Sequence, residues 1–318
     1  MKIASFNAQR FGQTKVSDPD VLSALVKIVS RYDIIVIIEV VDVTGAAVKL
    51  FLKELNEVNT THHYALQLSV RLGRNRYKEQ FLFLYSYQYE DNQVNDMDAF
   101  AREPYILRFK PHNTVLKDIV LIPVHTKPWD SERELDELYE VCLVVKDKWK
   151  TDNIMILGDF NADGVYVTPK EMQEIRIRSD KNFHWLIRDD VDTMARTSNE
   201  HTYDRIVVYG EDMLTACVPN SAKPFHFHKE FAMTEEKALR VSDHYPVEVE
   251  LHKAPPFWMT KSNRRCDSVD SSVHRAATES LQDDVLKMQK ENLLLEREKL
   301  QLLITLLKQR LSTLKLEQ

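Results

Sequence analysis

The segment Ile154–Asp163, with the sequence IMILGDFNAD, joins a short apolar run to a polar end. The four apolar residues before Gly158 predict a buried strand. Asp159 and Asn161 follow two positions apart, and because alternate residues at a strand end point the same way, both are expected to face the sheet edge. A carboxylate there can bind a divalent metal or accept a proton, and an amide can hold an oxyanion.

The same pattern of an apolar run with a polar end recurs along the chain. A predicted strand at Lys2–Phe6 runs into Asn7, and the β-branched run Ile34–Ile38, typical of a central strand covered on both faces, ends at Glu39. Further strands are predicted at Tyr64–Val70, Gln80–Tyr85, Pro104–Lys110, Asp118–Val124, Arg205–Tyr209 and Val247–Leu251.

Amphipathic helices are predicted between these strands, at Val21–Ser30, after Gly45 and at Ser131–Trp149. Two packed mixed sheets with helices outside satisfy this order of elements. The sequence therefore predicts an α/β sandwich, built as one domain over residues 1–252.

The character of the chain changes after residue 252. Residues 253–280 are rich in serine and scattered charge, which predicts a flexible linker. Over residues 281–318, leucines recur every seven positions, which predicts a coiled-coil helix. They stand at Leu286, Leu293, Leu300, Leu307 and Leu314. A homodimer or a helical partner is expected there, and a single amphipathic helix docked on the domain is the alternative.

Composition narrows the class of protein. Of 318 residues, 43% are hydrophobic and 29% charged, which is typical of a globular protein with a large core. No apolar run reaches the roughly 20 residues that a membrane-spanning helix needs. Three cysteines do not form a disulfide framework, and a net charge of −6 argues against electrostatically driven binding of bulk nucleic acid.

Two histidines, His125 and His244, end or follow predicted strands, and Glu79, Asp204 and Asp243 stand in similar places. A carboxylate fixes the tautomer of an imidazole and raises its pKa, which equips it for general acid–base catalysis. One such pair could activate water while the other protonates a leaving oxygen.

Hard oxygen ligands for Mg²⁺ or Ca²⁺ would come from Glu39, Asp159 and Asp243. Asn7 and Asn161 would hold phosphate oxygens. Together these groups specify the hydrolysis of a phosphate ester.

The chain resembles the endonuclease/exonuclease/phosphatase superfamily in five short motifs that contain these residues. They are Ser5–Asn7, Glu39, Gly158–Asn161, Tyr203–Arg205 and Ser242–His244. Narrower motifs resemble the deoxyribonuclease I family: Leu72–Asn75, Tyr77–Glu79, Arg102–Pro104 and Ser242–Glu248. The resemblance covers essentially all of residues 1–252.

The resemblance implies a four-layer α/β sandwich fold. It also implies an endonuclease that cleaves double-stranded DNA and uses Mg²⁺ and Ca²⁺ as cofactors, or Mn²⁺. It implies the pairs His125–Glu79 and His244–Asp204. It also implies that Arg74 and Tyr77 enter the minor groove and that Arg102 contacts the DNA backbone. Actin binding is left undecided.

The resemblance also bears on the compartment. It implies a secreted or endoplasmic-reticulum protein, whereas a chain without a leader before Met1 would be intracellular.

The chain departs from the family pattern in three places. Ile38 stands where a glutamine commonly precedes the catalytic glutamate, and Val41 stands where the archetype has a groove-reading arginine. The archetype's disulfide cysteines fall near Gly164 and at Glu200–His201, where this chain has none.

Two other hypotheses follow from the sequence. One keeps the fold but acts on a different phosphoester. The other is an interaction protein that works through its helical tail, with a weak or vestigial nuclease domain.

Overall fold

The computed structural model describes residues 1–60, 63–74, 77–85, 100–111, 114–198 and 200–254. The first compact unit of the chain spans Met1–Pro255. The coiled coil predicted at 281–318, and the predicted linker from residue 255 onward, lie outside the described residues. Within the described ranges, no helix is both long enough and apolar enough to cross a bilayer.

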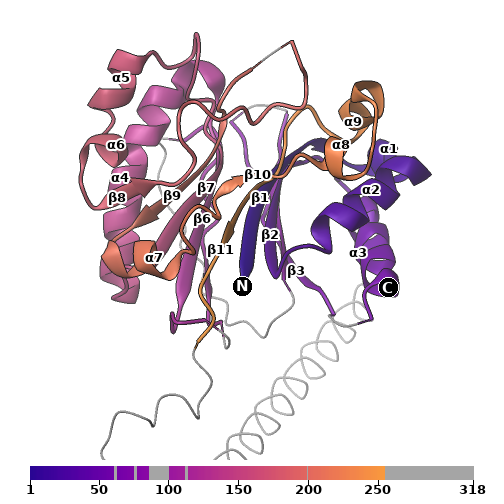
Figure 1. Ribbon diagram of the computed structural model, residues 1–318, viewed down its shortest axis with the longest axis horizontal. Helices are drawn as coiled ribbons and strands as arrows, with labels where there is room; N and C mark the ends of the chain where they lie inside the picture. The colour runs from indigo at the N-terminus through magenta and orange to yellow at the C-terminus, as the bar shows by residue number, and fades with distance from the viewer. Residues whose placement is uncertain (61–62, 75–76, 86–99, 112–113, 199, 255–318) are drawn as a thin grey trace, which may run out of the picture. The chain divides into compact units, whose positions relative to one another are not determined.

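Two mixed sheets form the centre of this unit (Figure 1). Within the described ranges, the first sheet has six strands in the order β10-β11-β1-β2-β4-β3. Their bounds are Lys223–Pro224 (β10), Val247–Glu250 (β11), Lys2–Phe11 (β1), Ile34–Val40 (β2), Gln80–Tyr85 (β4) and Ala65–Leu68 (β3). β1 and β2 are parallel, and the other neighbours in the sheet are antiparallel.

The second sheet has five strands within the described ranges, in the order β5-β6-β7-β9-β8. Their bounds are Leu107–Phe109 (β5), Ile119–His125 (β6), Ile154–Asp159 (β7), Asp204–Tyr209 (β9) and Phe183–Trp185 (β8). Only β6 and β7 are parallel among these pairs.

Helices cover the outer face of each sheet. Those packed on the first sheet are α1 (Gln13–Val16), α2 (Pro19–Val29), α3 (Ala46–Val58), α8 (Phe227–Glu230) and α9 (Glu235–Val241). Those packed on the second sheet are α4 (Ser131–Trp149), α5 (Pro169–Glu174) and α6 (Arg176–Ser179). Figure 1 shows the two groups on opposite sides of the paired sheets, so the predicted four-layer sandwich is confirmed for the described unit.

Three apolar layers hold the four layers of secondary structure together, and the side chains alternate between them. In β2, Ile34, Val36 and Ile38 enter the layer between the sheets, whereas Ile35 and Ile37 pack under the helices of the first sheet. β7 alternates in the same way between the central layer and α4. This double burial explains why these strands are apolar at every position.

Strand register brings polar strand ends to one end of the sandwich. His125 pairs with Asp159 across the parallel strands β6 and β7, and Asp159 pairs with Asp204 across β7 and β9. In the other sheet, Asn7 pairs with Ile38, the residue before Glu39. Since β1 faces β7 across the central layer, these ends lie together.

The first and last strands of the unit are paired. β1 runs antiparallel to β11, and the amino group of Met1 donates a hydrogen bond to the carbonyl oxygen of Leu251 at 3.0 Å. The side chain of Ser242, from the segment before β11, donates to the carbonyl oxygen of Asn7 at 2.6 Å.

The short helices between residues 163 and 241 were not predicted from the sequence. Besides α5, α6, α8 and α9, they include α7 (Glu211–Ala216). Each has only four to seven residues, too few for a helical repeat to show in the apolar pattern. Capping residues were the available signal: the side chain of Thr168 caps α5, and that of Thr234 caps α9.

Gly158 gives a test of how β6 and β7 pack. Its φ is +145°, and a Cβ there would lie 1.9 Å from the carbonyl oxygen of Val124. We expect Gly158→Ala to lower the free energy of unfolding by about 3 kcal/mol or more, because it adds a backbone clash to a strained φ. Urea denaturation measures this loss.

Gly45→Ala is the matched control. Gly45 also has a positive φ, +73°, but a Cβ there would meet nothing within 4 Å. It should cost only about 1 kcal/mol. Equal losses at the two positions would contradict the proposed close approach of β6 and β7.

Candidate active site

One histidine at the strand ends is held by a carboxylate on a neighbouring loop. The Nδ1 atom of His125 lies 2.7 Å from Oε2 of Glu79, and both side chains are buried. Arg102 donates to Oε1 of Glu79 at 2.9 Å and to the carbonyl oxygen of His125 at 3.1 Å. Burial lowers the pKa of His125, but the hydrogen bond and charge of Glu79 outweigh it, so the pKa is raised.

The second histidine has the same arrangement in a different place. Nδ1 of His244 lies 2.7 Å from Oδ2 of Asp204, at the start of β9. Burial acts to lower the pKa of His244, yet the charges of Asp204 and then Asp159 raise it to about 10. Burial raises the pKa of Asp204 to about 6. A protonated imidazole beside a carboxylate is therefore the stable form of this pair near neutral pH.

Asp159 lies between the two imidazoles. Its Oδ2 atom is 3.8 Å from Nε2 of His125 and 3.8 Å from Nε2 of His244. The side-chain amide of Asn7 donates to this same oxygen at 3.1 Å and to Oε1 of Glu39 at 3.0 Å. Asn7 thus bridges two carboxylates, and both histidines present their second ring nitrogen to the same small space.

The backbone around this space adopts left-handed conformations. Glu39 has a φ of +60°, and Gln9 and Arg10 have values of +45° and +59°. These turns aim main-chain amides inward: Gln9 N donates to Oδ1 of Asn7 at 2.9 Å, and Arg10 N donates to Oε2 of Glu39 at 2.9 Å. Such strained conformations persist where the surrounding structure holds them, often at functional sites.

Asn161 reaches the sheet edge through a left-handed turn and not through continued strand alternation, since its side chain contacts Thr126 directly after β6. β7 ends at Asp159, and Asn161 has a φ of +46°. Its side-chain amide donates to the carbonyl oxygen of Thr126 at 3.2 Å, and its main-chain amide donates to Oδ1 of Asp159 at 3.0 Å. Asn161 therefore lies at the site, and its side chain also holds the end of β6 through the hydrogen bond to Thr126.

Asp243 completes the acidic group. Its Oδ1 atom lies 4.0 Å from Nε2 of His244 and, though buried, has no hydrogen-bond partner among the described residues. Lys15 faces both Asp243 and Glu39; burial lowers the pKa of this lysine to about 8 against the pull of these two charges. Its amino group donates to the carbonyl oxygens of Ala8 and Val241.

The donor set suits a hard divalent cation. Among the described residues, no group of three or more His, Cys, Asp or Glu side chains is arranged to hold a metal ion by itself. Mg²⁺, however, is usually held by one or two carboxylates, with waters and substrate phosphates completing the shell. Glu39 and Asp159, bridged by Asn7, and the unpartnered oxygen of Asp243 fit such a partial shell.

The predicted DNA-contacting residues lie on loops around the site. Tyr77 is 48% exposed, and burial, followed by the charges of Glu79 and Glu39, raises its pKa. Arg74 lies in the same loop, between the bridge residues Leu72 and Glu79. Arg102 is only 18% exposed in its side chain and already bonds Glu79 and His125.

The structure also shows what surrounds the positions that depart from the family pattern. Ile38 is buried in the layer between the sheets, so it packs the core instead of facing the carboxylates. Val41 lines a cavity of about 510 Å³ together with Arg10 and Lys15. Where the archetype's disulfide would lie, Oδ2 of Asp163 is 3.2 Å from Nδ1 of His201, and hydrogen bonds join the two segments.

Sequence reasoning missed three residues that organise the site. Thr126 donates to the carbonyl oxygen of Phe160, and the Thr193 hydroxyl accepts hydrogen bonds from the main-chain amides of Tyr203 and Asp204. Lys15 is the third. A single hydroxyl or lysine in a short or irregular segment gives no periodic signal, although Thr126 directly follows His125.

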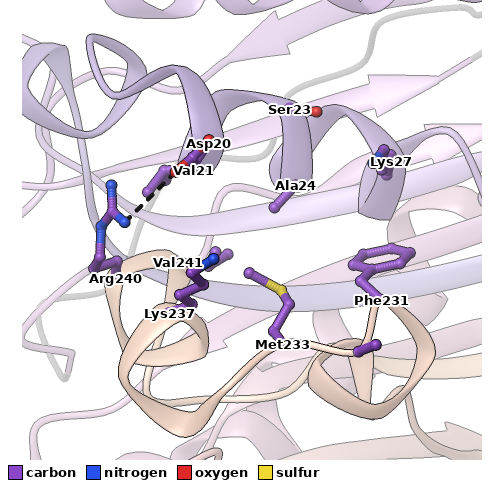
Figure 2. A pocket seen from close by; sticks show the side chains of 11 residues that line it. Asp20, Val21, Ser23, Ala24, Lys27, Phe231, Met233, Lys237, Arg240 and Val241 are labelled. Carbon is purple, nitrogen blue, oxygen red and sulfur yellow. Dashed lines mark ion pairs between the residues drawn. The ribbon is translucent and has the colours of Figure 1, made fainter.

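A cavity of about 290 Å³ between α2 and the α8–α9 segment is separate from this site (Figure 2). Lys27, Phe231, Met233 and Arg240 are among its lining residues, which include none of the predicted site residues.

Comparisons with known proteins show which family the chain belongs to. The profile of the Endonuclease/Exonuclease/phosphatase family matches residues 4–244. Deoxyribonuclease gamma of Homo sapiens is 42% identical over 275 residues, which cover 83% of this chain and 90% of that protein. Deoxyribonuclease-1 of Bos taurus is 44% identical over 262 residues, with 79% and 92% covered.

Solved structures are similar in fold. An endonuclease/exonuclease/phosphatase family protein from Leptotrichia buccalis has a TM-score of 0.56 at 14% identity, with 79% of this chain and 99% of that chain covered. Truncated TDP2 from Caenorhabditis elegans has a TM-score of 0.52 at 13% identity, with 78% and 96% covered. At these identities the likeness concerns the fold alone.

Replacing Asp204 tests the environment of His244. Asp204→Asn keeps the size of the side chain but removes its charge. We expect the pKa of His244 to fall from about 10 toward its ordinary value, because burial then acts against a smaller negative charge. Titration of the imidazole resonances by NMR in metal-free protein measures this. His125, whose partner Glu79 is unchanged, is the internal control; an unchanged His244 titration would contradict the pairing.

Proposed function

Because the chain belongs to the deoxyribonuclease I family of the endonuclease/exonuclease/phosphatase superfamily, we propose that it is a divalent-metal-dependent endodeoxyribonuclease. The observation that carries this proposal is the pair of histidines, each bonded to a buried carboxylate, on either side of Asp159. Such a site can accept a proton on one side of a phosphorus atom and donate a proton on the other side.

The two imidazoles divide the proton transfers between them. Each has its Nδ1 atom at a carboxylate, which leaves Nε2 to face the substrate. One Nε2 accepts a proton from the attacking water, and the other donates a proton to the leaving 3′ or 5′ oxygen of the phosphodiester. Glu79 and Asp204 fix the tautomers and stabilise the charged imidazoles, and Arg102 holds Glu79 in place.

Glu39, Asp159 and Asp243 would hold the cation, Mg²⁺ or Ca²⁺. A bound divalent cation supplies charge neutralisation at the phosphate oxygens and at the developing oxyanion. Asn7 keeps the carboxylates of Glu39 and Asp159 close together, because its amide donates to both. With both N–H groups of its amide so engaged, Asn7 acts chiefly on these ligands. The side-chain amide of Asn161 donates one hydrogen bond, to Thr126, so its second N–H is the freer candidate for donating to a phosphate oxygen.

Double-stranded DNA would lie across the end of the sandwich. Arg74 and Tyr77, on a loop beside Glu79, would enter the minor groove, where width and sugar surface are read. With a net charge of −6, the chain relies on a few local cations, so its affinity for DNA should be modest and should fall with salt in proportion to those few phosphate contacts.

The decisive experiment is nicking of supercoiled plasmid by the full chain with Mg²⁺ and Ca²⁺. Wild type should nick the plasmid, and EDTA should abolish this. His125→Ala and His244→Ala should each lower the rate about 10²- to 10⁴-fold, because each removes a proton-transfer group.

His184→Ala is the control for these variants, since His184 lies near Glu211 and outside the site. It should retain the wild-type rate. A folded wild-type protein that cuts no DNA with either metal would refute the nuclease proposal and leave the interaction hypothesis for the helical tail.

Glu39→Gln tests the cation site separately. It keeps the shape of the side chain but weakens a hard anionic ligand, so the Mg²⁺ concentration for half-maximal nicking should rise about tenfold or more. Glu57→Gln, in α3 with its side chain 58% exposed, is the control. If Glu39→Gln lowers the maximal rate without moving the Mg²⁺ dependence, Glu39 is not a metal ligand.

A further inference from the structure

A buried carboxylate near the first histidine takes no part in the proposed proton transfers. Glu134 lies in the first turn of α4 and is only 2% exposed. Within the described ranges, the hydrogen bonds that it accepts come from main-chain amides. Burying a carboxylate costs free energy unless donors or cations compensate for it, so the donors that meet Glu134 indicate what it does.

Two separate segments of the chain donate to the same oxygen of Glu134. Its Oε1 atom accepts a hydrogen bond from the main-chain amide of Ala101 at 3.2 Å and one from that of Lys127 at 3.4 Å. Ala101 precedes β5, and Lys127 follows the end of β6. One carboxylate oxygen of α4 therefore ties together two loops that are distant in sequence.

Both loops lead to the first histidine. The residue after the first amide is Arg102, which donates to Oε1 of Glu79 at 2.9 Å and to the carbonyl oxygen of His125 at 3.1 Å. The second amide comes two residues after His125. Glu134 is thus joined to His125 from two directions, through Arg102 and through the strand end itself.

The first turn of α4 also meets the end of β6 through hydroxyl groups. The hydroxyl of Ser131 lies 2.9 Å from that of Thr126 and 3.1 Å from the carbonyl oxygen of Lys127. Thr126 donates to the carbonyl oxygen of Phe160, next to Asp159, at 2.7 Å. The start of α4 therefore anchors the residues that directly follow the strand ends of the site.

The charges connect the same groups. Burial raises the pKa of Glu134, while its two main-chain donors and then the charge of Arg102 oppose this rise. Burial and, to a smaller extent, the charge of Arg102 lower the pKa of His125, against the effect of Glu79. The position of Arg102 therefore bears on the protonation of His125, and Glu134 helps to set that position.

We propose that Glu134 is a positioning residue of the active site, which holds His125 against Glu79 by fixing the Arg102 loop and the end of β6. This inference rests on the proposed nuclease function and adds to it a residue that touches neither substrate nor metal. An ionised carboxylate suits this task, because an anion accepts hydrogen bonds more strongly than a neutral group.

Steady-state cleavage of a duplex oligonucleotide by the full chain tests the catalytic consequence. Glu134→Ala should lower kcat about tenfold with KM within twofold, because it loosens a proton-transfer group without touching the substrate. Glu134→Gln, which keeps Oε1 as an acceptor for both amides, should recover most of the loss. Glu132→Ala is the matched control, since Glu132 lies in the same turn of α4 with an exposed side chain, and it should keep the wild-type kcat.

A double-mutant cycle distinguishes positioning of His125 from a general weakening of the fold. In a protein that already carries His125→Ala, Glu134→Ala should lower the rate less than twofold, because the group that it positions is gone. A full tenfold loss in that background would show that Glu134 acts elsewhere and would overturn the inference.

A second measurement needs no catalysis. In metal-free protein, the Nδ1 proton that His125 shares with Glu79 should exchange with solvent about tenfold faster in Glu134→Ala, because the loops around it open more often. The corresponding proton of His244, held by Asp204, is the internal control and should not change. NMR observes both protons in the same sample.

The exchange rates decide the inference independently of the function on which it rests. Unchanged exchange at His125, or equal acceleration at both histidines, would overturn it. If the wild type cuts no DNA, the nuclease proposal fails, and the exchange rates still decide whether Glu134 positions His125. If Glu134→Ala does not fold, Glu134→Asp takes its place: its carboxylate is one methylene short of the two amides and should accelerate exchange at His125 alone.

Discussion

Electrostatic repulsion among buried and half-buried carboxylates is the constraint on which the site depends. Glu39, Glu79, Asp159, Asp204 and Asp243 gather at one end of the two sheets, with two imidazoles among them. Like charges at such distances disfavour their own ionised forms unless cations or donors offset them. Each imidazole offsets one carboxylate, and the amide of Asn7 serves two. The remaining negative charge faces the space where a cation and a phosphate would meet.

This cluster exists because the two sheets pack face to face, with their polar strand ends at the same end of the sandwich. The parallel pair β6–β7 sets His125 beside Asp159, and the close approach of these strands requires the absence of a Cβ at Gly158. The pairing of β1 and β2 brings Asn7 near Glu39 in the other sheet. The apolar layer between the sheets then fixes the distance between the two halves. The packing of the core therefore also determines where the charged side chains lie.

The sequence predicted the long strands and most of the site for one physical reason. A strand buried on both faces is apolar throughout, so the first polar residue after it marks the sheet edge, as at Glu39, His125 and Asp159. The direction of Asn161 could not be predicted, because a left-handed backbone interrupts the alternation. Lys15 and the hydroxyl of Thr193 act through contacts distant in sequence, and the helices between residues 163 and 241 are too short to show periodicity. The leucine repeat of the tail lies beyond the described residues.

The pairing of the first and last strands has a consequence for biosynthesis. Asn7 leaves the ribosome early, but its carbonyl oxygen is held by Ser242, and the second histidine follows two residues later. At about 5–20 residues per second, roughly 12 to 50 seconds separate the synthesis of these two parts. Until residue 244 is made, the nascent chain carries at most one of the two imidazoles, so it lacks the second proton-transfer group. The topology itself delays activity until translation of the domain is complete.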